Sequence, residues 1–132
     1  MAALGKWFDE VVFPEGVALV SGPDDLPRYF RDIHRMALKH PISRALASDR
    51  GVWREMRQLR RAKRLDAIRK AVAAIGAPPR ATADATAMLL SLSGADASWP
   101  LRDHGLPPER IPDVLANTVE LIVAQLRAKV RR

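Results

Sequence analysis

The sequence predicts an all-α protein, folded as a single helical bundle of about six helices. Apolar residues recur at steps of three and four in several segments, which is the periodicity of amphipathic helices. These segments show neither an alternating strand pattern nor an Asn-Gly hairpin signal. At 132 residues, the chain has the length of one domain.

Prolines divide the first fifty residues into short helices. The first predicted helix covers residues 2–13, and the proline and glycine that follow limit its length. A second helix follows the turn at 21–25, and either aspartate of that turn is expected to accept hydrogen bonds from its first free amides. Pro41 ends this helix and opens a third helix over 42–48. The residues of the second helix that are expected to face the core are Leu26, Phe30, Ile33 and Ala37.

Residues 52–75 form the longest predicted helix, which carries almost all of the net charge. Residues 51–80 hold nine Lys and Arg against two Asp and Glu, whereas the two remaining parts of the chain are each balanced. Gly76 supplies the left-handed conformation that commonly closes a helix, and the prolines that follow prevent continuation. The stripe expected to face the core comprises Val52, Met56, Leu59, Ala62, Leu65, Ile68, Val72 and Ile75.

The next helix is predicted over residues 82–99, with Thr82 as its cap and Pro100 as its end. Small side chains line one of its faces, so another helix can approach closely or a ligand can find room. These small residues are Ala83, Ala87, Ser91, Gly94 or Ala95, and Ser98.

Residues 107–132 form the last predicted helix, after a loop over 101–106. Prolines stand in its first turn, with Glu109 and Asp113 at the positive end of the helix dipole and basic residues at the negative end. Its apolar residues cover more than one face. A terminal helix of this kind usually covers more than its own domain, which predicts a partner subunit.

The composition excludes several kinds of site. Without cysteine, the chain has no disulfide, thiol nucleophile or zinc-thiolate site. No apolar run approaches the ~20 residues that cross a bilayer, and the first residues lack a secretory signal, so we expect a soluble, cytoplasmic protein. His34, His40 and His104 lack metal-ligand spacing, and Ser91 and Ser93 have no base nearby in sequence. We therefore predict no metal site, no cofactor and no enzymatic activity.

Three stretches carry a family resemblance. DDLPRYFRDIHRMALKHPISRAL over 24–46 looks like a helix, a His-Pro break and a short helix, and GVWREMRQLRRAKRLDAI over 51–68 like a long following helix. MLLSLSGADASWPLRDHGLPPERIPDVLANTVELIVAQL over 88–126 looks like two C-terminal helices with a Gly-Leu-Pro-Pro-Glu start. Together they resemble the C-terminal, effector-binding and dimerisation domain of the TetR/AcrR family of transcriptional regulators.

The resemblance implies a homodimer and a ligand pocket. The last two helices of each subunit would pair into a four-helix bundle, and the earlier helices would enclose a small apolar or amphipathic effector. The expected dimer interface comprises Ala87, Ser91, Ala95, Val114, Leu115, Thr118, Ile122 and Leu126. The expected pocket residues are Phe30, His34, Trp53, Met56, Leu59, Met88 and Trp99, which are also the residue types found in cores.

Members of the family normally begin with a DNA-binding unit that contains a helix-turn-helix, and this sequence shows none. Residues 1–20 are expected to match at most the end of a connecting helix, and residues 21–132 the effector domain. DNA contact is therefore expected only through a domain outside this sequence. A fragment, a mis-started reading frame and a natural remnant that dimerises without binding an operator are all compatible with this pattern.

The basic helix offers an alternative function. A small basic helical protein could bind nucleic acid non-specifically through Arg54–Lys70, since clustered Lys and Arg release counterions from phosphates. The opposing interpretation is a solvated helix whose arginines cover apolar neighbours with the aliphatic parts of their side chains. The segment has no interleaved exposed aromatic residues and no recognition-helix pattern, which favours the solvated helix.

Overall fold

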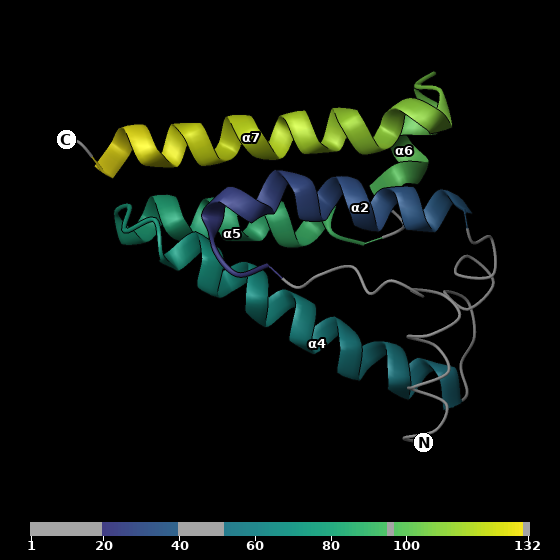
Figure 1. Ribbon diagram of the computed structural model, residues 1–132, viewed down its shortest axis with the longest axis horizontal. Helices are drawn as coiled ribbons and strands as arrows, with labels where there is room; N and C mark the ends of the chain where they lie inside the picture. Colours follow the sequence, from purple (N-terminus) through teal and green to yellow (C-terminus); the bar gives the residue numbers. More distant parts are fainter. Residues whose placement is uncertain (1–19, 40–51, 95–96, 131–132) are drawn as a thin grey trace.

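The computed structural model describes residues 20–39, 52–94 and 97–130, without the side chains of residues 39 and 52–60 (Figure 1). These residues contain no strand, which confirms the all-α prediction for this part of the chain. The predicted helices over 2–13 and 42–48 lie outside it. The described elements are η1 (Pro23–Asp25), α2 (Leu26–Lys39), α4 (Val52–Ala73), α5 (Pro79–Leu92), α6 (Ser98–Asp103), η3 (Pro108–Arg110) and α7 (Ile111–Val130).

Three helices run side by side along the length of the molecule, and a fourth crosses them at an angle. α7 packs against both α2 and α5, running in the opposite direction to each (Figure 1). α4 packs against α5 at its C-terminal end, and its N-terminal half diverges from α2 (Figure 1). The bundle is therefore closed at one end of α4 and splayed at the other.

One apolar core joins the four long helices. α2 contributes Leu26, Tyr29, Phe30 and Ile33, which lie on one face because they are three and four residues apart. The side chains that complete the core come from α4, α5 and α7: Ile68, Ala71, Val72, Ala85, Leu89, Val119, Val123 and Leu126.

The predicted stripe of α4 agrees with the structure from Leu65 onward. Ile68 and Val72 are fully buried, and Leu65 and Ile75 are half-buried. Ala62 is exposed, contrary to its place in the predicted stripe. It is the eleventh of the 22 residues of α4, a helix whose N-terminal half diverges from α2 (Figure 1). The remaining stripe residues, Val52, Met56 and Leu59, have side chains outside the described part of the chain.

The break between α4 and α5 confirms one prediction and corrects another. Gly76 has a φ of 78°, the left-handed conformation expected where α4 ends. Thr82 is not the cap of the next helix, because α5 already begins at Pro79. The Thr82 hydroxyl instead donates to the carbonyl of Ala77 at 3.2 Å. A proline at the first helical position loses no hydrogen bond, so this proline starts the helix rather than only preventing the previous one from continuing.

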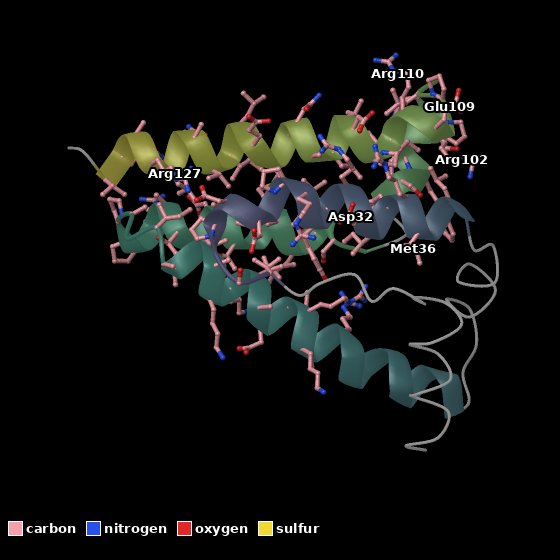
Figure 2. All side chains as sticks on the ribbon, in the orientation of Figure 1. Asp32, Met36, Arg102, Glu109, Arg110 and Arg127 are labelled. Carbon is pink, nitrogen blue, oxygen red and sulfur yellow. The ribbon has the colours of Figure 1, made fainter. Side chains whose placement is uncertain are left out.

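The region after α5 differs most from the sequence-based expectation. The predicted helix over 82–99 is divided, since α5 ends at Leu92 and the separate helix α6 follows. Pro100 lies in the first turn of α6 and does not end a helix. Arg102, Glu109 and Arg110 project outward at this end of the molecule (Figure 2). The last helix begins with η3 and α7, in agreement with the predicted proline start at 107–108.

Ion pairs border the contact between α2 and α7. Arg31 Nε lies 3.0 Å from Asp113 Oδ1, and Arg35 Nη2 lies 3.6 Å from the same oxygen. At the opposite end of the contact, Arg127 pairs with Asp24. Each of these pairs is partly exposed and contributes less than about 1 kcal/mol, so they orient the helices more than they stabilise them.

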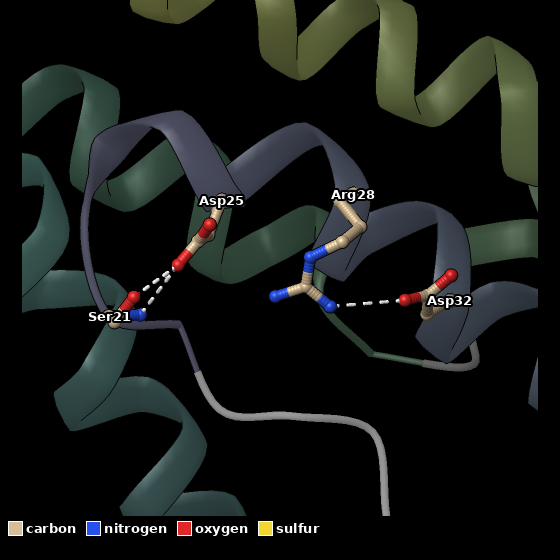
Figure 3. Close-up of polar contacts among 4 residues, drawn as sticks. All are labelled: Ser21, Asp25, Arg28 and Asp32. Carbon is tan, nitrogen blue, oxygen red and sulfur yellow. Dashed lines mark hydrogen bonds and ion pairs between the residues drawn. The ribbon is translucent and has the colours of Figure 1, made fainter.

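The aspartates of the first turn have roles other than the predicted one. The carboxylate of Asp25 accepts hydrogen bonds from the backbone N–H and the hydroxyl of Ser21, which precedes the helix (Figure 3). The hydrogen bonds from Ser21 lower the pKa of Asp25. Arg28 and Asp32 form the next pair along α2, at 3.2 Å (Figure 3). The aspartate thus closes the turn before the helix instead of accepting from its first amides.

Substitution of Leu89 tests the core. Leu89→Ala is expected to destabilise the fold by about 2–5 kcal/mol, because it removes a fully buried side chain and leaves a cavity. Met88→Ala, at the exposed neighbouring position, is the control and is expected to change stability by less than about 0.5 kcal/mol. Urea denaturation followed by circular dichroism measures both, and equal effects would contradict this packing.

Candidate functional site

His34 is the one buried polar or charged residue among the described side chains. It lies on α2 with 2% of its surface exposed. Its Nε2 atom is 2.9 Å from the carbonyl oxygen of Leu92, the last residue of α5, to which the ring N–H donates. Burial lowers the pKa of His34 below 6.5, and the charge of Arg64 lowers it further, against the opposing effect of the Leu92 hydrogen bond. The neutral imidazole therefore joins α2 to the end of α5.

Two aromatic residues lie one turn before this histidine. Phe30 is fully buried, and its ring meets that of Tyr29 edge to face at a centroid distance of 6.0 Å. The Tyr29 hydroxyl is buried and has no hydrogen-bond partner among the described residues. Burial raises the pKa of Tyr29. Sequence analysis missed Tyr29, although its position three residues after Leu26 and four before Ile33 places it on the core face.

Four of the predicted pocket residues have described side chains, and the structure brings two of these four together. Phe30 and His34 are buried one turn apart on α2. Met88 is 54% exposed on α5 and Trp99 is 45% exposed on α6, so neither lies in the interior with them. The side chains of Trp53, Met56 and Leu59 lie outside the described part of the chain.

Two open grooves lie on the described surface, and none of the predicted pocket residues lines them. The larger, of ≈ 650 Å³, runs between α2 and α7 and is bordered by Arg28, Arg31 and Arg127. The smaller, of ≈ 380 Å³, lies between Ser21 and α4, beside Asp66. Both are rimmed by charged side chains, unlike the mostly apolar enclosure typical of a small-molecule pocket.

The residues predicted for a dimer interface divide into a surface set and a core set. Ala87 and Ser91 are exposed on α5. Leu115 and Leu126 are buried within the chain itself, at 2% and 3% exposure, so they have no surface to offer a second subunit. Ala95 lies outside the described residues. The remaining three predicted residues, all half-buried on α7, are Val114, Thr118 and Ile122.

A stripe of uncharged residues follows the outer side of α7. Leu121 is the most exposed large apolar residue of the described chain, at 71%. It belongs to a series spaced alternately by four and three residues, the spacing of a helix-to-helix seam. This α7 stripe comprises Val114, Thr118, Leu121, Gln125 and Ala128. The sequence-based predictions did not include Leu121, although its spacing from Val114 and Thr118 was visible.

The basic residues of α4 lie mostly in water. Arg61, Lys63, Arg69 and Lys70 are exposed, and Arg64 is half-buried. Lys70 Nζ pairs with Asp66 on the same helix at 3.0 Å. These positions agree with the solvated helix inferred from the sequence.

No known family model, curated protein or solved structure matches the chain. Within the part of the chain that the structure describes, no three His, Asp or Glu side chains are grouped so as to hold a metal ion. No helix in that part is long and apolar enough to cross a membrane.

Acidification tests the environment of His34. Because its pKa in the folded state is below 6.5, the unfolded chain takes up the proton first, and stability is expected to fall as the pH drops below 6.5. His34→Gln keeps an N–H donor for the Leu92 carbonyl but does not titrate. The free energy of unfolding of this variant, measured by urea denaturation between about pH 7.5 and 5.5, is therefore expected to fall less with decreasing pH than that of the unaltered chain.

The control for this experiment is Met88→Gln. Met88 is exposed and does not titrate, so its replacement is expected to leave the pH dependence as in the unaltered chain. An unchanged pH dependence in His34→Gln would contradict the assignment.

Proposed function

We propose that this chain is a homodimeric effector-binding and dimerisation domain of the kind found in TetR-like transcriptional regulators. The resemblance of the three sequence stretches motivates the proposal, and the uncharged stripe on the outer side of α7 is the structural observation that supports it. Recognition of an operator sequence would require a helix-turn-helix domain outside these 132 residues.

The α7 stripe favours a second copy of the chain as its partner. All five of its residues are uncharged, whereas Asp113, Glu120 and Arg127 lie toward the α2 side of the helix. In a two-fold dimer, each surface meets its own copy, so an uncharged stripe avoids like-charge contact. α5 lies beside α7 and adds exposed small residues, which permit close helix approach: Ala83, Ala87 and Ser91.

The interior around α2 supports the effector half of the proposal. Phe30 and Tyr29 supply apolar surface, while His34 and the Tyr29 hydroxyl supply polar atoms that could orient a ligand. Small-molecule sites combine these two kinds of surface. An effector that binds among these residues would act between α2 and α5, which His34 joins.

A ligand can change DNA binding only if it distinguishes two states of the dimer. It would need different affinities for two arrangements of the subunits, and typical couplings of this kind amount to about 1–3 kcal/mol. α5 belongs both to the His34 contact and to the proposed dimer surface. A shift of α5 would therefore connect the ligand with the subunit arrangement.

Replacement of Leu121 tests the dimer. Leu121→Glu places a charge in the centre of the α7 stripe, and a dimer buried there is expected to dissociate into monomers. Because Leu121 is 71% exposed, the substitution is expected to leave the fold intact. Ile122→Asp is a less clear test, because Ile122 is half-buried and its substitution can also unfold the chain.

Light scattering after size-exclusion chromatography measures the mass of each variant. Ala73→Glu adds the same charge at an exposed position of α4 and is expected to remain dimeric. A monomeric unaltered chain, or a dimeric Leu121→Glu variant, would contradict the proposed interface.

Effector binding is tested by thermal unfolding in the presence of small apolar and amphipathic compounds. A ligand at about 100 times its Kd stabilises the folded chain by about 2.7 kcal/mol and raises the midpoint accordingly. Phe30→Leu, which reshapes the interior beside His34, is expected to reduce this shift relative to its own ligand-free midpoint. Equal shifts in both proteins would place the ligand elsewhere.

A further inference from the structure

The positive charge of this chain belongs to one helix. α4 carries eight Lys and Arg against two Asp and Glu, in a chain of formal net charge +7. The rest of the sequence is therefore close to neutral. A positive charge spread over the whole surface would serve solubility, whereas a charge confined to one element produces a local field that attracts polyanions.

Most of the other described basic residues have acidic neighbours. Arg28, Arg31 and Arg35 pair with aspartates, and so does Arg127. At the far end of the molecule, Arg102 precedes Asp103 and Glu109 precedes Arg110, so charges of both signs alternate there (Figure 2).

Among the described residues, α4 lacks such compensation. Between residues 61 and 70 it has five basic side chains and one acidic side chain, Asp66, which pairs with Lys70. Arg61, Lys63 and Arg69 are exposed and make no ion pair with another described residue. Within the described part of the chain, these three cations carry charge that no acidic side chain neutralises.

The length of the helix suits an extended anion. At about 1.5 Å per residue, the 22 residues of α4 span about 33 Å. The four exposed basic residues between 61 and 70 span about 14 Å, a length comparable to four base pairs of a duplex at 3.4 Å each. α4 also forms one edge of the described bundle and diverges from α2 (Figure 1).

We propose that α4 binds the phosphate backbone of double-helical DNA, without reading its sequence, through Arg61, Lys63, Arg69 and Lys70. Contacts to phosphates position a protein but carry no sequence information directly. The proposal does not depend on the effector function, since it concerns another surface. It assigns to this chain a DNA contact of its own, separate from any helix-turn-helix domain.

Two other polyanionic partners fit this surface less well. A helix that lies on a lipid membrane inserts an exposed apolar face, whereas Ile68, Ala71 and Val72 of α4 are buried in the core. Proteins that bind single-stranded nucleic acid stack its bases on aromatic rings, and residues 61–73 of α4 contain none. A duplex presents regular phosphates and requires neither feature.

Fluorescence anisotropy with a labelled duplex of about 20 base pairs tests the proposal, using the full chain. Four phosphate contacts predict a slope of about −3.6 for log K against log salt, and a loss of roughly 100-fold in affinity between about 50 and 200 mM salt. The triple variant Arg61→Gln, Lys63→Gln, Arg69→Gln is expected to reduce the slope by about 2.7. Two duplexes of unrelated sequence are expected to bind with equal affinity.

The matched control removes the same charge from another surface. Arg102→Gln, Arg110→Gln and Lys129→Gln together change three exposed basic residues outside α4 and are expected to leave the slope unchanged. An equal effect of both triple variants would show that net charge alone is responsible and would overturn the proposal.

Two further outcomes would also overturn the proposal. One is a strong preference for one duplex sequence. The other is equally tight binding of anionic phosphatidylserine vesicles that the α4 substitutions abolish, because it would identify a membrane surface. Thermal midpoints close to that of the unaltered chain verify that both triple variants are folded.

Discussion

The bundle depends on the burial of one face of α2. This helix has 14 residues, a length at which an isolated helix in water is marginal, so its structure requires tertiary contacts. Leu26 and Phe30 lose all of their exposed surface between α7 and the other helices. Burial of a large apolar side chain contributes about 1.5–3 kcal/mol, more than any of the exposed ion pairs at the border of this contact. The ion pairs fix how α7 lies on α2, and the apolar contact holds it there.

Sequence periodicity predicted those elements whose ends have a single chemical signal. The α2 helix, the end of α4 at Gly76 and the proline start before α7 agree with expectation. The errors occur at residues with two possible roles. Pro79 can stop one helix or begin the next, and Pro100 likewise sits in the first turn of α6. Local sequence does not determine which role a proline takes, because the answer depends on where the neighbouring helices pack.

Burial was harder to predict than helix formation. α7 is apolar on more than one side, and periodicity alone cannot say which side faces α2; the structure buries Leu115 and exposes Leu121. The candidate pocket shows the same limit, since Phe30 and Met88 are both large and apolar but only Phe30 is interior. The chemical types of the candidate site residues could thus be read from the sequence. Their grouping could not, because it depends on the rotation of each helix against its neighbours.

Tyr29 sets a limit on how firmly this fold is held. Its hydroxyl lies in the interior without a partner among the described residues, and a buried unsatisfied polar group costs about 1–3 kcal/mol. A typical domain is stable by only about 5–15 kcal/mol in total. One oxygen atom in the first turn of α2 therefore offsets about as much free energy as the burial of one large apolar side chain contributes.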